Sequence, residues 1–171
     1  MIRIARMLKR IHTRTVRVRD GAFAIVASRY NARYVDAMVR AARNELKRAG
    51  AGVQVVRVPG AYEIPLVAAR LAKNASLTDS SSRILAIICL GVILRGETVH
   101  AAHIGEAVSR ALMEIQVAHD IPVIHEVLLL ENETQARARC LNPGHNRGTE
   151  AAQTALAMAR VMQSLENESA F

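Results

Sequence analysis

The stretch "ILAIICLGVILRGETVHAAH", residues 84–103, decides the fold class of this chain. Its first eleven residues form a continuous apolar run, which is typical of a strand buried on both faces in a parallel sheet. The rest is polar and holds a glycine, an acid, a hydroxyl and two histidines within residues 96–103. This change predicts a buried strand over 84–94, followed by a helix over about 101–119.

Segments of the same two kinds alternate along the rest of the chain. Further strands are predicted at 22–28, 53–58 and 122–130, and further helices at 30–51, 62–75, 133–140 and 149–165, with loops at 76–82 and 141–148. The strand segments carry apolar residues on both faces, so helices should cover both faces of the sheet. The pattern predicts a three-layer α/β/α sandwich around a mostly parallel four-stranded sheet.

The positive charge of the chain is concentrated at its N-terminus. The net charge is +8, but residues 1–21 hold seven basic residues against Asp20 alone, which leaves +2 for the other 150 residues. We therefore expect a basic tail over 1–21 and a single α/β domain over 22–171. Disorder, docking on a neighbouring subunit, a short amphipathic helix and a transit peptide all fit the tail.

Composition narrows the class of protein. Half of the residues are hydrophobic, enough for one compact domain with a substantial core. Two cysteines, Cys89 and Cys140, provide no disulfide framework. No apolar stretch is long enough to span a bilayer, and the N-terminus lacks the apolar core of a secretory signal. These features predict a cytoplasmic protein.

Polar and planar side chains follow the predicted strands, where parallel α/β sheets place their ligand sites. Tyr30 comes after the first strand, Glu63 after the second, and residues 96–100 after the third. Tyr30 offers a flat face for a heterocycle, although it could equally be a surface tyrosine. Glu63 could accept hydrogen bonds from substrate hydroxyls or merely interact with a helix dipole. Together, these polar and planar side chains predict a small-molecule site at the carboxyl ends of the strands.

The segment from Gly96 to Thr98 fits two interpretations. It could cradle a phosphate with its backbone N–H groups and the Thr98 hydroxyl, or Thr98 could simply cap the helix. His100, beside that segment, is suited to proton transfer near neutral pH. His103 is expected to be an exposed helix residue. A metal is not expected, because the two histidines lack a third ligand at any familiar spacing.

Arg137 and Arg139 form a further candidate pair. They could lie on a solvated helix face, and only one of them is expected to point at the cleft. An arginine suits a phosphate because its planar fork binds two oxygens at once.

Three segments in register, "PGAYEIP", "LGVILRGETVH" and "NRGTEAAQTALAMA", resemble the lumazine synthase family over residues 22–165. The resemblance implies a flavodoxin-like fold and condensation of 5-amino-6-(D-ribitylamino)uracil with 3,4-dihydroxy-2-butanone 4-phosphate. The products are 6,7-dimethyl-8-ribityllumazine and phosphate, in riboflavin biosynthesis. It implies no metal or organic cofactor. The expected partners are the two small substrates, further copies of the chain and riboflavin synthase, with neither membrane nor nucleic acid.

The resemblance also implies a role for each candidate residue. His100 becomes the catalytic proton-transfer residue, and Arg139 the phosphate arginine. The residues expected to bind the pyrimidine ring are Tyr30, Val92, Ile93, Leu94 and His125. Those expected to bind the ribityl chain are Ala61, Tyr62 and Glu63, and those expected to bind the phosphate are Glu97, Thr98 and Arg139.

Three positions depart from the family pattern. His125 stands where the family usually has a phenylalanine that completes the site from the neighbouring subunit, Tyr30 replaces Phe or Trp, and Arg147 replaces a common lysine. Because the ring pocket is changed, an alternative function is that of a flavin- or lumazine-binding homologue with weak catalysis. Because the tail is basic, a second alternative is a shell protein that binds nucleic acid. Family members form pentamers, and the short loop 141–148 resembles that of members whose pentamers build icosahedral shells.

Overall fold

The computed structural model describes residues 21–75 and 83–168. The tail predicted over 1–21 lies outside this part except for Gly21, and so does the loop predicted at 76–82. Four strands alternate with helices: β1 (Ala22–Ser28), α1 (Ala32–Arg48), β2 (Gly52–Val58), η1 (Ala61–Glu63), α2 (Ile64–Ala75), β3 (Ile84–Leu94), α3 (His100–His119), β4 (Val123–Leu130), α4 (Glu133–Ala136), η3 (Arg137–Leu141) and α5 (Arg147–Glu168).

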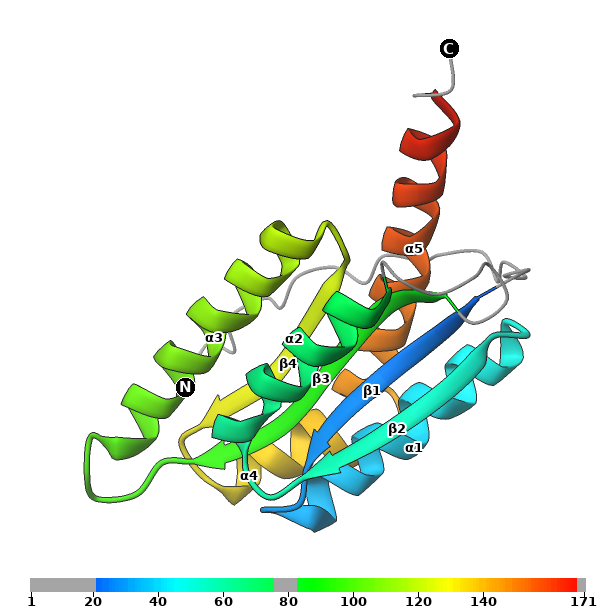
Figure 1. Ribbon diagram of the computed structural model, residues 1–171. Coiled ribbons are helices and arrows are strands. Elements are labelled where there is room, and N and C mark those ends of the chain that lie inside the picture. The colour runs from blue at the N-terminus through cyan, green and yellow to red at the C-terminus, as the bar shows by residue number, and fades with distance from the viewer. Residues whose placement is uncertain (1–20, 76–82, 169–171) are drawn as a thin grey trace.

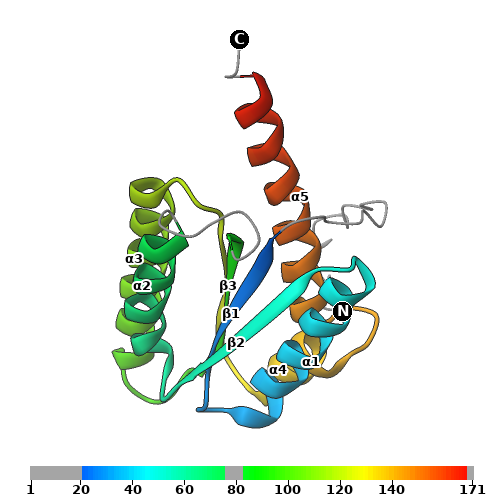
Figure 2. The ribbon, with the colours of Figure 1, turned by 45° about the vertical axis from the view of Figure 1, so that its right-hand side comes forward.

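The described strands form one sheet in the order β2-β1-β3-β4, and all neighbouring pairs are parallel. Helices α2 and α3 cover one face, whereas α1, α4 and α5 cover the other (Figures 1 and 2). The predicted three-layer sandwich with a parallel sheet is thus confirmed. β3 and β1 are almost wholly buried, which agrees with their uninterrupted apolar sequences.

Two apolar clusters fill the spaces between the layers. Side chains on one face of the sheet, among them Ile25, Ile88 and Ile124, pack against α1 and α5. Those on the other face, among them Val26 and Val127, pack against α2 and α3. Successive strand residues point to opposite faces, so each buried strand contributes to both clusters.

The last part of the chain differs from the prediction in two details. The helix predicted over 133–140 is a single α-helical turn, α4, followed by the π-helical turn η3. The closing helix α5 begins at Arg147, two residues before the predicted start. Its first residues pack closely on α1, because a Cβ placed on Gly148 would lie only 2.0 Å from the backbone oxygen of Met38. A glycine is needed there, and α5 starts where that contact forms.

Candidate functional site

All four strands point their carboxyl ends to the same edge of the sheet (Figure 1). The β1–α1 turn, η1, the segment 95–99 and α4 lie along this edge. It is the place where an open parallel sheet forms its ligand site. Most of the predicted site residues lie on these segments.

β3 extends past β1 at this edge. The β1 pairing ends at Leu90 of β3, whereas the β4 pairing continues to Leu94. The backbone of residues 91–94 therefore has no strand partner on the β1 side. One of its groups is occupied, since the Asn31 side-chain amide donates a 2.7 Å hydrogen bond to the Val92 carbonyl oxygen. The remaining groups of this short edge are suited to an amide-like ligand.

The side chains of Val92 and Ile93 are buried in the two apolar clusters and point away from solvent. We predicted that residues 92–94 line the pyrimidine. In this geometry Val92 and Ile93 can do so only through their main chain, which uracil-like N–H and C=O groups can match.

Tyr30 and Glu63 meet at the Pro59–Gly60 turn. The Tyr30 amide donates to the Pro59 carbonyl at 3.1 Å, and a Cβ on Gly60 would lie 3.2 Å from Tyr30 Cδ2. The same Cβ would lie 2.9 Å from Glu63 Oε2, so a larger residue at position 60 would displace the Glu63 carboxylate. Tyr30 is 72% exposed and Tyr62 is 65% exposed. Two aromatic rings thus lie uncovered at the carboxyl edge.

The Glu63 carboxylate accepts a 2.9 Å hydrogen bond from the Gly60 amide. Of the two interpretations of Glu63, the local one at a helix start is therefore present in the structure. A carboxylate has further lone pairs, so this bond leaves room for a ligand hydroxyl. Ala61, next to it, is partly buried against the α2–α3 cluster.

Glu97, Thr98 and His100 are exposed at the start of α3. The helix is capped at Val99 with no side-chain hydrogen bond, so the alternative of Thr98 as an N-cap is not what the structure has. Gly96 has no close neighbours and no positive φ, and a larger residue would fit there. A special backbone conformation at Gly96 is therefore absent, and the Thr98 hydroxyl makes no cap bond.

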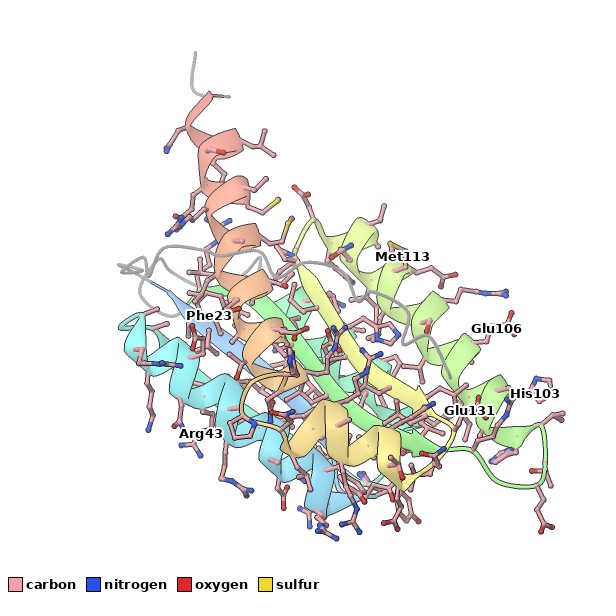
Figure 3. All side chains as sticks on the ribbon, turned by 180° about the vertical axis from the view of Figure 1, so that it is seen from behind. Phe23, Arg43, His103, Glu106, Met113 and Glu131 are labelled. Carbon is pink, nitrogen blue, oxygen red and sulfur yellow. The ribbon has the colours of Figure 1, made fainter. Side chains whose placement is uncertain are left out.

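His103 is exposed one turn further along α3 and extends outward from the helix with Glu106 (Figure 3). It lies in a shallow hollow of about 410 Å³ on this helix, lined by His103, Glu106, Ala107, Arg110, Ala111 and Glu114. Within the described residues, no three side chains of the types that ligate metals come together.

The arginines near the carboxyl edge differ in their partners. Arg95 pairs with Glu131 at 2.9 Å, and Arg137 pairs with Glu133 at 3.3 Å. Arg139, half-buried on η3, forms no hydrogen bond or ion pair with the described part of the chain. It is therefore the guanidinium in this segment that remains available to an anion.

His125 is set apart from the other candidates. It pairs with Cys89, five residues before the ends of β3 and β4, which places it roughly 16 Å from the carboxyl edge. Its Nε2 lies 2.7 Å from the Ser109 hydroxyl, and its Nδ1 accepts the Val127 amide at 3.2 Å. Partial desolvation lowers the pKa of His125. The structure does not bring His125 together with Tyr30 of the same chain.

Both described cysteines are free and buried. Burial raises the pKa of the Cys89 thiol strongly and that of Cys140 to about 11. Both therefore stay protonated at neutral pH and are unsuited to nucleophilic chemistry. Among the described helices, none combines the length and apolarity needed to cross a membrane.

The family's sequence model, described as 6,7-dimethyl-8-ribityllumazine synthase, matches residues 20–163. This chain belongs to that family. Synthases of this name from Stenotrophomonas maltophilia (strain R551-3) and Xanthomonas campestris pv. campestris (strain B100) are each 40% identical to it over 146 residues. The alignments cover 84% of this chain and 90% of each relative. A lumazine synthase from Xanthomonas euvesicatoria is 39% identical over the same lengths.

Two features of this candidate site were missed from the sequence. The Asn31 bond to Val92 joins residues far apart in the chain, and the extension of β3 past β1 depends on strand register. Asn31 has a left-handed backbone, with φ 55°, which asparagine tolerates better than most residues. Its position directly after Tyr30 was the one available signal.

Proposed function

We propose that the chain catalyses 6,7-dimethyl-8-ribityllumazine formation from 5-amino-6-(D-ribitylamino)uracil and 3,4-dihydroxy-2-butanone 4-phosphate, as part of riboflavin biosynthesis. Family membership gives the reaction class. The observation that carries the proposal is the carboxyl edge itself. An unpaired piece of β3 backbone, an exposed tyrosine and an uncommitted arginine lie on neighbouring segments there.

The pyrimidine is assigned to the β3 edge. The N–H and C=O groups of a uracil ring can pair with the free backbone groups of residues 92–94, as a neighbouring strand would. The Tyr30 ring supplies a stacking face. Ala61, Tyr62 and Glu63 hold the ribityl chain, with the Glu63 carboxylate accepting from its hydroxyls.

The butanone phosphate is assigned to Arg139, with Glu97 and Thr98 contacting the same substrate. Arg139 lacks a carboxylate partner in the described structure, whereas Arg137 beside it is paired. A phosphate therefore does not have to displace an acid in order to bind Arg139. Two parallel N–H···O contacts would fix the substrate's orientation.

His100 transfers protons as the amine adds to the ketone. Loss of water then gives the imine, elimination releases phosphate, and ring closure with loss of a second water forms the pyrazine ring. His100 is exposed at the first residue of α3, close to the phosphate segment. Holding two reactive molecules together supplies much of the rate, because a bimolecular step becomes effectively unimolecular.

His125 is assigned to the site of a neighbouring copy. It cannot reach Tyr30 within its own chain. It lies on the edge strand β4, and α3, which packs against β4, exposes the apolar side chains of Met113 and Val117. An edge strand with uncovered apolar neighbours favours coverage by another subunit. We propose a cytoplasmic homopentamer, with pentamers assembling into an icosahedral shell. Riboflavin synthase is the proposed protein partner.

The flavin-binding alternative rests on one observation: His125 is already hydrogen-bonded to Ser109 and Val127, which restricts its freedom to stack. Incubating the full chain with both substrates separates the two functions. We expect lumazine absorbance to rise together with one equivalent of released phosphate, and a solution mass of a pentamer or a multiple of it. Tight riboflavin binding without turnover would favour the alternative, and a monomeric active enzyme would remove the role of His125 in a neighbouring site.

A further inference from the structure

A buried carboxylate interrupts the apolar face of β4. Glu126 is only 7% exposed, although the neighbouring side chains on its face, Ile124 and Leu128, are apolar. Burial raises the pKa of Glu126, and the guanidinium of Arg147 opposes that shift. Burying an ion pair generally stabilises a fold no better than apolar residues would. Its presence here therefore calls for another explanation.

Arg147, the first residue of α5, is held from two sides. Its Nε and Nη2 donate to the two Glu126 oxygens at 3.0 and 2.8 Å, and its Nη1 donates to Glu150 at 2.6 Å. The bidentate contact fixes the plane of the guanidinium as well as its place. The start of α5 is thereby fastened to the edge strand β4 through what we call the Glu126–Arg147 clasp.

The clasp connects directly to the segment that carries Arg139. Asn146, beside Arg147, donates its side-chain amide to the Cys140 carbonyl and accepts from the Gly148 amide at 2.9 Å. Cys140 follows Arg139 in the π-helical turn η3. Side-chain contacts join Glu126 to Arg147 and Asn146 to Cys140, and peptide bonds join Arg147 to Asn146 and Cys140 to Arg139.

The backbone of η3 needs such support. Wide π-helical turns are rare and are frequently found at functional sites. The Arg139 side chain makes no ion pair or hydrogen bond with the described residues. Its direction therefore depends on longer-range attraction to the Glu126 carboxylate and on the backbone beneath it, which Asn146 holds at the neighbouring residue.

We propose that Glu126 and Arg147 are positioning residues that aim the Arg139 guanidinium at the phosphate of the butanone substrate. This proposal rests on the proposed function, which assigns the phosphate to Arg139. The clasp acts through geometry: the paired contacts set where α5 begins, and Asn146 transmits that position to η3. The pair contacts neither substrate itself.

Two substitutions test whether the geometry of the clasp positions Arg139, and a third serves as the matched control. Glu126→Gln removes the charge but keeps the shape, and Arg147→Lys keeps the charge but loses the planar fork. Glu133→Gln breaks the exposed pair with Arg137, next to Arg139, without touching the clasp. We expect both clasp variants to raise the KM for the butanone phosphate about tenfold, since small displacements of a positioning group have large effects. Their kcat and pyrimidine KM should stay near the wild-type values, as should all constants of Glu133→Gln.

Combination with Arg139→Ala distinguishes positioning from general loosening. If the clasp acts through Arg139, adding Glu126→Gln to Arg139→Ala should cause no further rise in the KM for the phosphate substrate. An additive rise, an equal rise for both substrates, or an unchanged KM in Arg147→Lys would each overturn the proposal. Hydrogen exchange of residues 137–147 gives a second readout, and we expect it to be faster in both clasp variants than in Glu133→Gln. Unchanged exchange would also count against the clasp.

The clasp and the proposed function fail in different ways. If the wild-type protein forms no lumazine, the proposed function fails. The clasp is then judged by inorganic phosphate binding, followed by phosphorus NMR, in the wild type, Arg139→Ala and both clasp variants. Weaker phosphate binding in all three variants than in the wild type supports the positioning role of the clasp. If the wild type turns over and Arg139→Ala raises the phosphate KM while the clasp variants do not, only the clasp fails.

Discussion

The side-chain amide of Asn31 donates a 2.7 Å hydrogen bond to the carbonyl oxygen of Val92, across the point where β3 runs beyond β1. The bond replaces the strand pairing that β1 no longer provides, and it ties the Tyr30 turn to the β3 edge. We therefore expect Asn31 to matter both for stability and for the shape of the pyrimidine site.

Substitutions of Asn31 should separate these contributions. Asn31→Gly keeps access to the left-handed backbone and loses only the hydrogen bond, which should lower the free energy of unfolding by about 1 kcal/mol. Asn31→Ala adds left-handed strain of about 1–2 kcal/mol. Urea unfolding of both variants measures the difference. If glycine is as destabilising as alanine, backbone strain is not part of the effect.

Removing the Arg139 guanidinium should affect one substrate. Arg139→Ala is expected to raise the KM for 3,4-dihydroxy-2-butanone 4-phosphate strongly, because the phosphate loses a bidentate partner. The KM for the pyrimidine should remain close to that of the wild type. Steady-state kinetics with each substrate varied in turn provides the measurement, and Arg137→Ala is the matched control because Arg137 is already paired with Glu133. Equal effects on both substrates would contradict the assignment.

The two histidines near the start of α3 should differ in importance. His100→Ala is expected to slow turnover by roughly ten- to a hundredfold, the low end of general acid–base effects, because the amine and ketone react unaided. His103→Ala should change turnover little, since its side chain extends outward from the helix (Figure 3). Both rates are compared at saturating substrates, after the assembly has been verified by solution mass. A slower His103→Ala enzyme would reverse the assignment.

His125 should make the protein sensitive to mild acid. Its folded pKa is lowered, so the unfolded chain binds the proton first as the pH falls below the ordinary value of 6.5. Stability should therefore decrease with falling pH between 6.5 and the lower folded value, as protonation of Nδ1 removes the acceptor of the Val127 amide. His125→Phe should remove this part of the pH dependence while keeping or improving turnover.

Thermal unfolding of the wild type and His125→Phe at several pH values tests the linkage. Pyrimidine affinity measured over the same range tests the stacking role, and we expect it to weaken in acid for the wild type only. Loss of all activity in His125→Phe with the assembly intact would point to a specific polar role for the imidazole instead.

Gly148 should be intolerant of any side chain. Gly148→Ala would place a Cβ about 2 Å from the Met38 backbone oxygen, which cannot move without separating α5 from α1. We expect a loss of about 3 kcal/mol, the upper part of the range for overpacking. Gly96→Ala is the control, with a change within about 0.5 kcal/mol, because its Cβ would meet no atom within 4 Å. Similar denaturation midpoints for the two variants would contradict this packing argument.

Local patterns in the sequence predicted most of the fold. The apolar run 84–94 coincides with β3, and α1 (Ala32–Arg48) lies within the helix predicted over 30–51. These signals depend on neighbours within a few residues, which is why they can be found without the structure. The π-helical form of η3 has no such signal, since it depends on how α5 and Asn146 meet the turn.

The sequence by itself determined the order of strands and helices, the parallel sheet and the segments that follow each strand, because hydrophobic periodicity and strand–helix alternation are local properties. The tertiary structure alone decided which arginines have partners: Arg137 and Arg147 form ion pairs, whereas Arg139 forms none with the described residues. It also decided that β3 extends beyond β1 and that His125 lies far from Tyr30. Those relationships join residues distant in sequence through strand register and helix packing, which no local pattern specifies.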